Sequence, residues 1–169
     1  MSLINETKLN FDYRQLIIEH NQIEIPKDYS YDQNQIAITS LDGKNVMVDN
    51  KFNEDYKRIP EMDLNLLNEW FKDTYVEEVI NEVNKHYNTT KWRFMKLTSE
   101  RRAYSYHRDE TKRLHIPLLT NEDCFFIIDE QLLKMNQVGK VYEMDTTKKH
   151  TALNLGWSDR IHMVGIYYD

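Results

Sequence analysis

A histidine and an aspartate stand two residues apart in the segment 104–119, YSYHRDETKRLHIPLL. Because residues i and i+2 of a β-strand point to the same face, His107 and Asp109 project together if this segment is extended. A neutral imidazole and an ionised carboxylate are both metal ligands. A solvated turn after Tyr106 explains the same tripeptide and is the commoner structure, so a metal site requires a third ligand.

A third ligand and a cation follow nearer the C-terminus. His150 opens the segment HTALN, and Arg160 stands ten residues later. Two histidines and one carboxylate on one side of a metal form the facial triad of non-haem Fe(II) oxygenases, which leaves adjacent positions open. If residues 155–159 form a hairpin turn, His150 and Arg160 face one pocket from adjacent strands, and the guanidinium can hold a carboxylate there. A surface arginine paired with Asp159 is the alternative.

Short strands must position most of these residues. From residue 91 onward, apolar and polar residues alternate, and turn signals separate the apolar runs. No helical period intervenes, so we predict a mainly β, antiparallel barrel or jelly roll. The expected strands are 104–109, 113–119, 124–128, 138–144, 150–154 and 160–168.

The N-terminal part, about 11–87, mixes strands with one or two helices. Residues 63–87 repeat apolar side chains every three or four positions, which predicts an amphipathic helix, or two helices broken near Asp73 and Thr74. The segment 11–20 fits either a helix or a strand. Further expectations are strands around Ile23, Ile25, Ile36, Ile38, Val46 and Val48, a turn at 41–44 and a surface loop at 49–60.

Composition limits the class of protein. The chain has 169 residues, with 22 basic and 28 acidic side chains and a net charge of −6. This length fits a single domain over residues 1–169, with its β core at about 91–169. An acidic chain gains little from releasing counterions, so we expect no nucleic-acid partner. The single cysteine, Cys124, excludes an internal disulfide, and no run suits a signal peptide or membrane span, which predicts a cytoplasmic protein.

Four short motifs, taken in order and spacing, resemble the Fe(II)/2-oxoglutarate-dependent dioxygenases. The closest resemblance is to their aspartyl/asparaginyl β-hydroxylase branch, and it is strongest over residues 91–169. The motifs are H-x-D at His107 and Asp109, RLHIPL at 113–118, HTALN at 150–154 and RIH at 160–162. The resemblance implies a double-stranded β-helix that holds Fe(II) through His107, Asp109 and His150. Such an enzyme uses O₂ and 2-oxoglutarate to hydroxylate a C–H bond, with release of succinate and CO₂.

The resemblance also implies a binding pocket for the cosubstrate. Arg160 would pair with the distal carboxylate of 2-oxoglutarate, and Arg113 and His115 would line the same pocket. A buried structural ion pair would explain Arg113 equally well. Asn154 and His162 match motif positions that are either pocket-lining or structural.

The substrate stays open at this stage. An amino acid, an Asp- or Asn-like peptide side chain and another small molecule all fit, and the compact chain favours a small molecule or a short peptide. A non-catalytic cupin-like protein that binds metal or ligand is the alternative, but it treats Arg113 and Arg160 as coincidences. Relatives that demethylate nucleic acids carry a second arginine six residues after the first, where this chain has Ile166.

Overall fold

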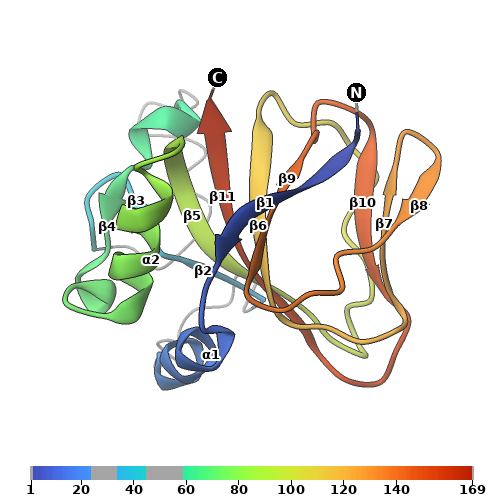
Figure 1. Cartoon of the computed structure of the whole chain (residues 1–169), viewed down its shortest axis with the longest axis horizontal. Coiled ribbons are helices and arrows are strands. Elements are labelled where there is room, and N and C mark those ends of the chain that lie inside the picture. The colour runs from blue at the N-terminus through green and yellow to red at the C-terminus, as the bar shows by residue number, and fades with distance from the viewer. Residues whose placement is uncertain (1, 24–33, 45–58, 169) are drawn as a thin grey trace.

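Two facing antiparallel sheets make up most of the protein (Figure 1). The computed structural model describes residues 2–23, 34–44 and 59–168, so the expected strand positions Ile25, Val46 and Val48 lie outside the described residues. The helical elements are α1 (Tyr13–Gln22), η1 (Glu61–Asp63), η2 (Glu69–Phe71) and α2 (Tyr75–Val83). The strands are β1 (Ile4–Asn10), β2 (Gln35–Ala37), β3 (Thr39–Ser40), β4 (Leu66–Leu67), β5 (Asn88–Leu97), β6 (Lys112–Leu119), β7 (Cys124–Ile128), β8 (Gln131–Leu133), β9 (Lys140–Met144), β10 (His150–Asn154) and β11 (Arg160–Tyr168).

The larger sheet has six strands in the order β1-β9-β6-β11-β5-β2, and the smaller sheet has three in the order β10-β7-β8. From β6 onward the chain passes repeatedly from one sheet to the other, which is how a double-stranded β-helix is built. Apolar side chains of both sheets meet between them, among them Leu97, Phe126, Ile128 and Met144. The expected mainly β jelly roll is therefore confirmed.

The helices cover the outer face of the larger sheet. Strand alternation turns Trp92 and Phe94 of β5 to this side, where they pack with apolar residues of α1 and α2. The intervening residue, Arg93, is consequently turned to the inner face, between the sheets. No helix of the described residues is long and apolar enough to cross a membrane.

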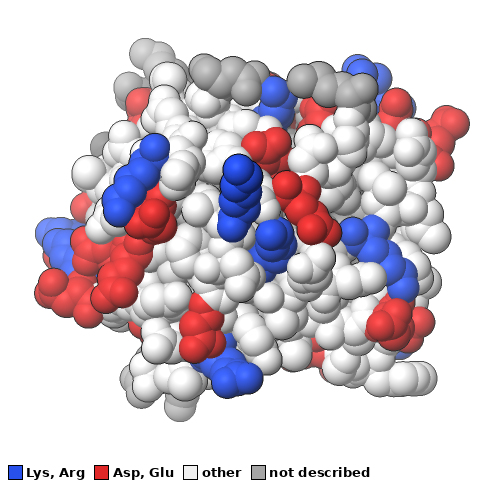
Figure 2. All heavy atoms as spheres, viewed as in Figure 1, with Lys and Arg blue, Asp and Glu red and all other residues white. Residues whose placement is uncertain are grey.

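Charge on the surface follows the acidic composition. On the face drawn in Figure 2, acidic side chains gather near α2, and basic side chains are scattered, with two of them next to each other near the middle. The first turn of α2 carries two of the acidic residues of this helix, Glu77 and Glu78.

Five of the six strands expected after residue 91 are present, within two residues at either end. The sixth, 104–109, is wrong, because this charged segment makes an isolated bridge, His107 to His150, in place of a continuous ladder, and Ala103 just before it makes another, to Leu153. Strands β1 and β8 were not expected. Cys124 is buried.

The helix expected over 63–87 is correct only for its second part, α2. Before α2, η1, β4 and η2 bury Leu64 and Phe71 without an α-helix, because the backbone pairs with neighbouring segments. Asn68 N–H donates to Ile38 O at 2.9 Å, and Lys91 N–H donates to Leu64 O at 2.8 Å. Strand β5 then starts at Asn88. The undecided segment 11–20 forms α1, whose N-terminus is capped by the Asp12 side chain.

The hairpin expected at 155–159 is also wrong. Strand β10 pairs with β7 in the smaller sheet, whereas β11 pairs with β5 and β6 in the larger one. Residues 155–159 therefore connect the two sheets. Asn154 fixes this connection, because its Nδ2 donates to Leu97 O at 3.2 Å and to Ser158 O at 2.8 Å. The contacts of Asn154 are thus structural.

Candidate metal centre

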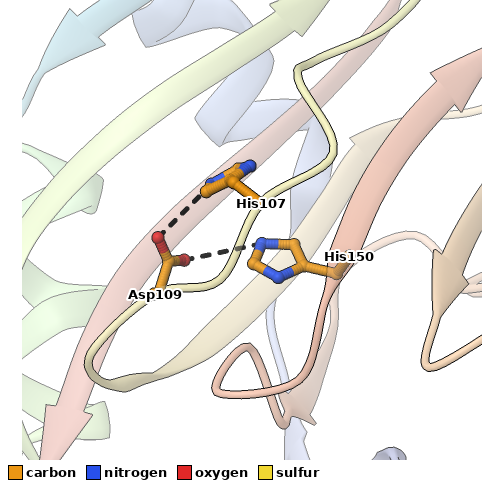
Figure 3. Close-up of side chains that lie close together, drawn as sticks. All are labelled: His107, Asp109 and His150. Carbon is orange, nitrogen blue, oxygen red and sulfur yellow. Dashed lines mark ion pairs between the residues drawn. The ribbon is translucent and has the colours of Figure 1, made fainter.

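His107, Asp109 and His150 converge on one point, as Figure 3 shows. Nε2 of His107 lies 3.4 Å from Oδ1 of Asp109, and Nε2 of His150 lies 3.5 Å from Oδ2. One ligand atom from each residue lies within 4.8 Å of the other two. Two imidazoles and one carboxylate at such distances can hold one metal ion on one face, as the facial triad does.

The backbone sets this geometry. His107 N–H donates to His150 O at 3.1 Å, and His150 N–H donates to His107 O at 2.8 Å, so the two histidines stand directly opposite each other. Asp109 N–H donates to Thr146 O at 2.9 Å, which holds the third side chain beside them. The three residues are therefore positioned by the pairing of the segment 104–109 with the start of β10 and with Thr146, in the connection before β10.

Both histidines present Nε2 to the centre because Nδ1 is engaged elsewhere. Nδ1 of His107 lies 2.7 Å from Ser105 O, and Nδ1 of His150 lies 3.0 Å from Lys148 O. A carbonyl can only accept, so each Nδ1 carries the proton and each Nε2 keeps its lone pair. Burial lowers the pKa of His150, which favours the neutral, ligating form. The donor set thus fits a transition metal.

Arg113 belongs to this centre. Its Nε donates to Oδ2 of Asp109, and both side chains are largely buried. Burial raises the pKa of Asp109, but the hydrogen bond and charge of Arg113 outweigh it and keep the pKa below its usual value. The structure shows the ion pair with a carboxylate that the sequence left as the alternative for Arg113, whereas its expected place in the cosubstrate pocket stays a prediction.

Arg160 lies deeper between the sheets and is 2% exposed. Its guanidinium carbon lies 4.7 Å from the centre of the Phe126 ring, and Nη2 lies 3.1 Å from Nδ1 of His162. Asp159 does not pair with it, because that carboxylate lies 2.6 Å from Nζ of Lys96. Among the described residues, no carboxylate forms an ion pair with Arg160, so the surface alternative is excluded.

Two neutral histidines accompany Arg160. Burial lowers the pKa of His115 and of His162 well below the usual value, and the charge of Arg160 adds to this effect. If Nδ1 of His162 accepts from Arg160, its Nε2 carries a proton, and this buried atom has no hydrogen-bond partner. A guanidinium and an orphaned imidazole donor together suit a carboxylate ligand. His115 lies 3.4 Å from His162 through their Nδ1 atoms, so His115 belongs to this group, and its expected role beside the cosubstrate stays a prediction.

Arg93 was missed by the sequence interpretation, and so was a buried ion pair beside it. Arg93 is 8% exposed, and its Nε contacts Sδ of Met95 at 3.2 Å. Lys91 pairs with Glu61 at 2.6 Å. The alternation of β5 around Trp92 and Phe94 would have placed Arg93 between the sheets, had the strand been followed residue by residue.

Comparison with known proteins gives a family. The model of the aspartyl/asparaginyl beta-hydroxylase family matches residues 5–166. A search of curated proteins found no match.

Two solved structures share the fold. One is the viral collagen prolyl hydroxylase vCPH from Paramecium bursaria Chlorella virus-1, with a TM-score of 0.55 and 11% identity, over 99% of this chain and 91% of that chain. The 2OG complex of the same protein gives a TM-score of 0.54 and 10% identity, over 98% of this chain and 96% of that chain. At this identity the likeness concerns the fold alone.

Proposed function

The chain belongs to the aspartyl/asparaginyl β-hydroxylase family, and from this premise we propose that His107, Asp109 and His150 hold its catalytic iron while Arg160 binds the cosubstrate. The protein is a hydroxylase that uses Fe(II), 2-oxoglutarate and O₂. The observation that carries the proposal is that the Nε2 lone pairs of His107 and His150 converge with the ionised carboxylate of Asp109. A further hydrogen bond fixes each of these three side chains. When bound, the iron supplies the chemistry that couples decarboxylation of 2-oxoglutarate to hydroxylation.

The side chains of this protein contribute position and shielding. Arg160 orients a carboxylate through charge-assisted hydrogen bonds, and His162 adds a donor beside it. Phe126 covers the guanidinium from the smaller sheet, which keeps water out and strengthens the interaction. His107 stands at the rim with 42% of its side chain exposed, so a substrate can approach the metal centre from that side.

The substrate is a small molecule or a peptide. Within this class we propose a free amino acid or an Asp- or Asn-like side chain of a short peptide, because the metal centre opens at the rim beside His107. The buried Arg160, without a carboxylate partner among the described residues, favours cosubstrate binding over the alternative of a non-catalytic cupin-like protein.

A screen for substrate-dependent turnover tests this proposal. The purified chain with Fe(II), 2-oxoglutarate and O₂ is offered free amino acids and Asp-, Asn- and Pro-containing peptides, while succinate and the product mass are measured. We expect at least one compound to stimulate succinate formation and to gain one oxygen atom. His150→Ala serves as the control without a complete triad. Equal succinate formation by wild type and His150→Ala would contradict the assigned centre.

A further inference from the structure

Four buried cations lie on the inner faces of β5, β6 and β11, but the described residues provide only two acidic partners for them. The exposed fractions are 9% for Lys91, 8% for Arg93, 6% for Arg113 and 2% for Arg160. Glu61 pairs with Lys91, and Asp109 pairs with Arg113. Arg93 and Arg160 are left without a carboxylate among the described residues.

A buried cation without a counter-ion is costly, and a protein keeps one mainly where a ligand supplies the missing charge. The proposed function already assigns Arg160 to 2-oxoglutarate. Arg93 has no such explanation, because its Nε donates to the thioether of Met95, which is a weak and uncharged acceptor. Burial and the charge of Arg113 lower the pKa of Arg93 to about 10, so the guanidinium still carries its charge at neutral pH.

Arg93 stands apart from Arg160 but close to the metal centre. In the sheet register, Arg93 of β5 is opposite Val164 of β11, and Val164 is in turn opposite His115 of β6. Along β11, Val164 stands two residues from Ile166, which is opposite Arg113, and four residues from Arg160. Arg93 therefore lies nearer to the row of Arg113, the partner of Asp109, than to that of Arg160.

We propose that Arg93 is the substrate anchor, and that the substrate carries a carboxylate which pairs with this guanidinium beside the metal centre. The proposal rests on the function proposed above and narrows its substrate class to carboxylate-bearing molecules. Free amino acids and acidic side chains belong to this class, whereas their amides do not. Arg93 would then fix which C–H bond faces the iron, because its guanidinium holds one end of the substrate in a defined direction.

The first experiment needs neither iron nor 2-oxoglutarate. Thermal unfolding of the metal-free full chain is compared for wild type, Arg93→Met and the matched control Lys91→Met. We expect Arg93→Met to raise Tm by about 2 °C or more, because it removes a buried charge that lacks a partner. Lys91→Met should lower Tm, because it removes the partner of Glu61 on the same strand. A lower Tm for Arg93→Met, or its failure to fold, would show that Arg93 is structural and would overturn the proposal.

The second experiment measures succinate formation with matched acids and amides: L-aspartate, L-asparagine and L-proline against their α-amides. We expect at least one acid to stimulate the wild type and its amide to do so at least about tenfold less, a difference equivalent to about 1.4 kcal/mol. Arg93→Met should lose this stimulation, Arg93→Lys should retain part of it, and affinity for 2-oxoglutarate should change less than stimulation in both variants.

Three results would refute the role of Arg93 as substrate anchor: equal stimulation by acids and amides, no stimulation by any acid, or full stimulation of Arg93→Met. A wild type that forms no succinate at all contradicts the proposed function instead, and the unfolding comparison then still decides the role of Arg93.

Discussion

Replacing Arg113 by methionine should weaken metal binding far more than binding of 2-oxoglutarate. Arg113 donates to Oδ2 of Asp109, the same oxygen that lies 3.5 Å from Nε2 of His150. Without this donor, the carboxylate loses both its orientation and the charge that keeps it ionised in a buried setting. Loss of a group that hydrogen-bonds to a metal ligand typically costs about 10–100-fold in metal affinity, which corresponds to about 1.4–2.8 kcal/mol.

The assay is a competition between the protein and a chromophoric chelator for Fe(II) or Co(II) under anaerobic conditions. Lys112→Met is the matched control, because it removes a cation from the same strand but leaves the pair of Arg113 and Asp109 intact. Affinity for 2-oxoglutarate is then measured at saturating metal. Unchanged metal affinity together with a large loss of 2-oxoglutarate affinity would refute the assignment and return Arg113 to the cosubstrate pocket.

Three further predictions concern other parts of the chain. Arg160→Met should weaken 2-oxoglutarate binding by about 10–100-fold, since hydrogen bonds to charged groups contribute about 1.5–3 kcal/mol; an equal loss of metal affinity in the chelator assay would make Arg160 structural. Gly165→Ala should cost about 1–3 kcal/mol of unfolding free energy, because its Cβ would lie 2.6 Å from two atoms of the Trp92 ring; an unchanged urea midpoint would contradict this packing. Burial raises the pKa of Glu61, but Lys91 lowers it by more, so the pKa of Glu61 in the folded protein is below its usual value. The stability that this pair contributes is therefore present above the usual carboxyl pKa of about 4.3 and is lost as pH falls through the lower folded value. Glu61→Gln should therefore show a shallower loss of stability on acidification in urea titrations, and a slope equal to that of wild type would exclude this pair as its source.

Local alternation was sufficient to predict the strands that run through the core. Strands β7, β10 and β11 have the predicted bounds, because each alternates or runs apolar between clear turn signals. The segment 104–109 misled the prediction, since its backbone makes isolated bridges that only the folded arrangement provides. The apolar spacing of Leu64, Leu67 and Phe71 fits a helix, yet pairing with β3 and β5 overrides that preference.

Contacts that the strand pattern does not specify account for what the sequence could not predict at the site, even where the partners are close in the chain, as Asp109 and Arg113 are. The sequence predicts that Arg113 and Arg160 point inward, but it cannot say which carboxylate each one meets. Asp109 and 2-oxoglutarate both present a carboxylate, and only the three-dimensional arrangement assigns Arg113 to Asp109. Likewise, the spacing of His150 and Arg160 suits a hairpin, whereas the chain uses those residues to change sheets. The sequence could bring together the three residues of the candidate metal centre because their short motifs can be recognised without knowledge of the strand pairing.

The most direct test of the central claim is the visible spectrum of the protein under anaerobic conditions with Fe(II) and 2-oxoglutarate. If His107, Asp109 and His150 hold iron to which 2-oxoglutarate binds, the wild type should show a weak charge-transfer band. The band should be absent in His107→Ala and His150→Ala. Stoichiometric additions of iron or of 2-oxoglutarate should not restore it in either variant. A well-folded wild-type protein without this band, or variants that retain it, would contradict the assignment of these three residues as the iron site.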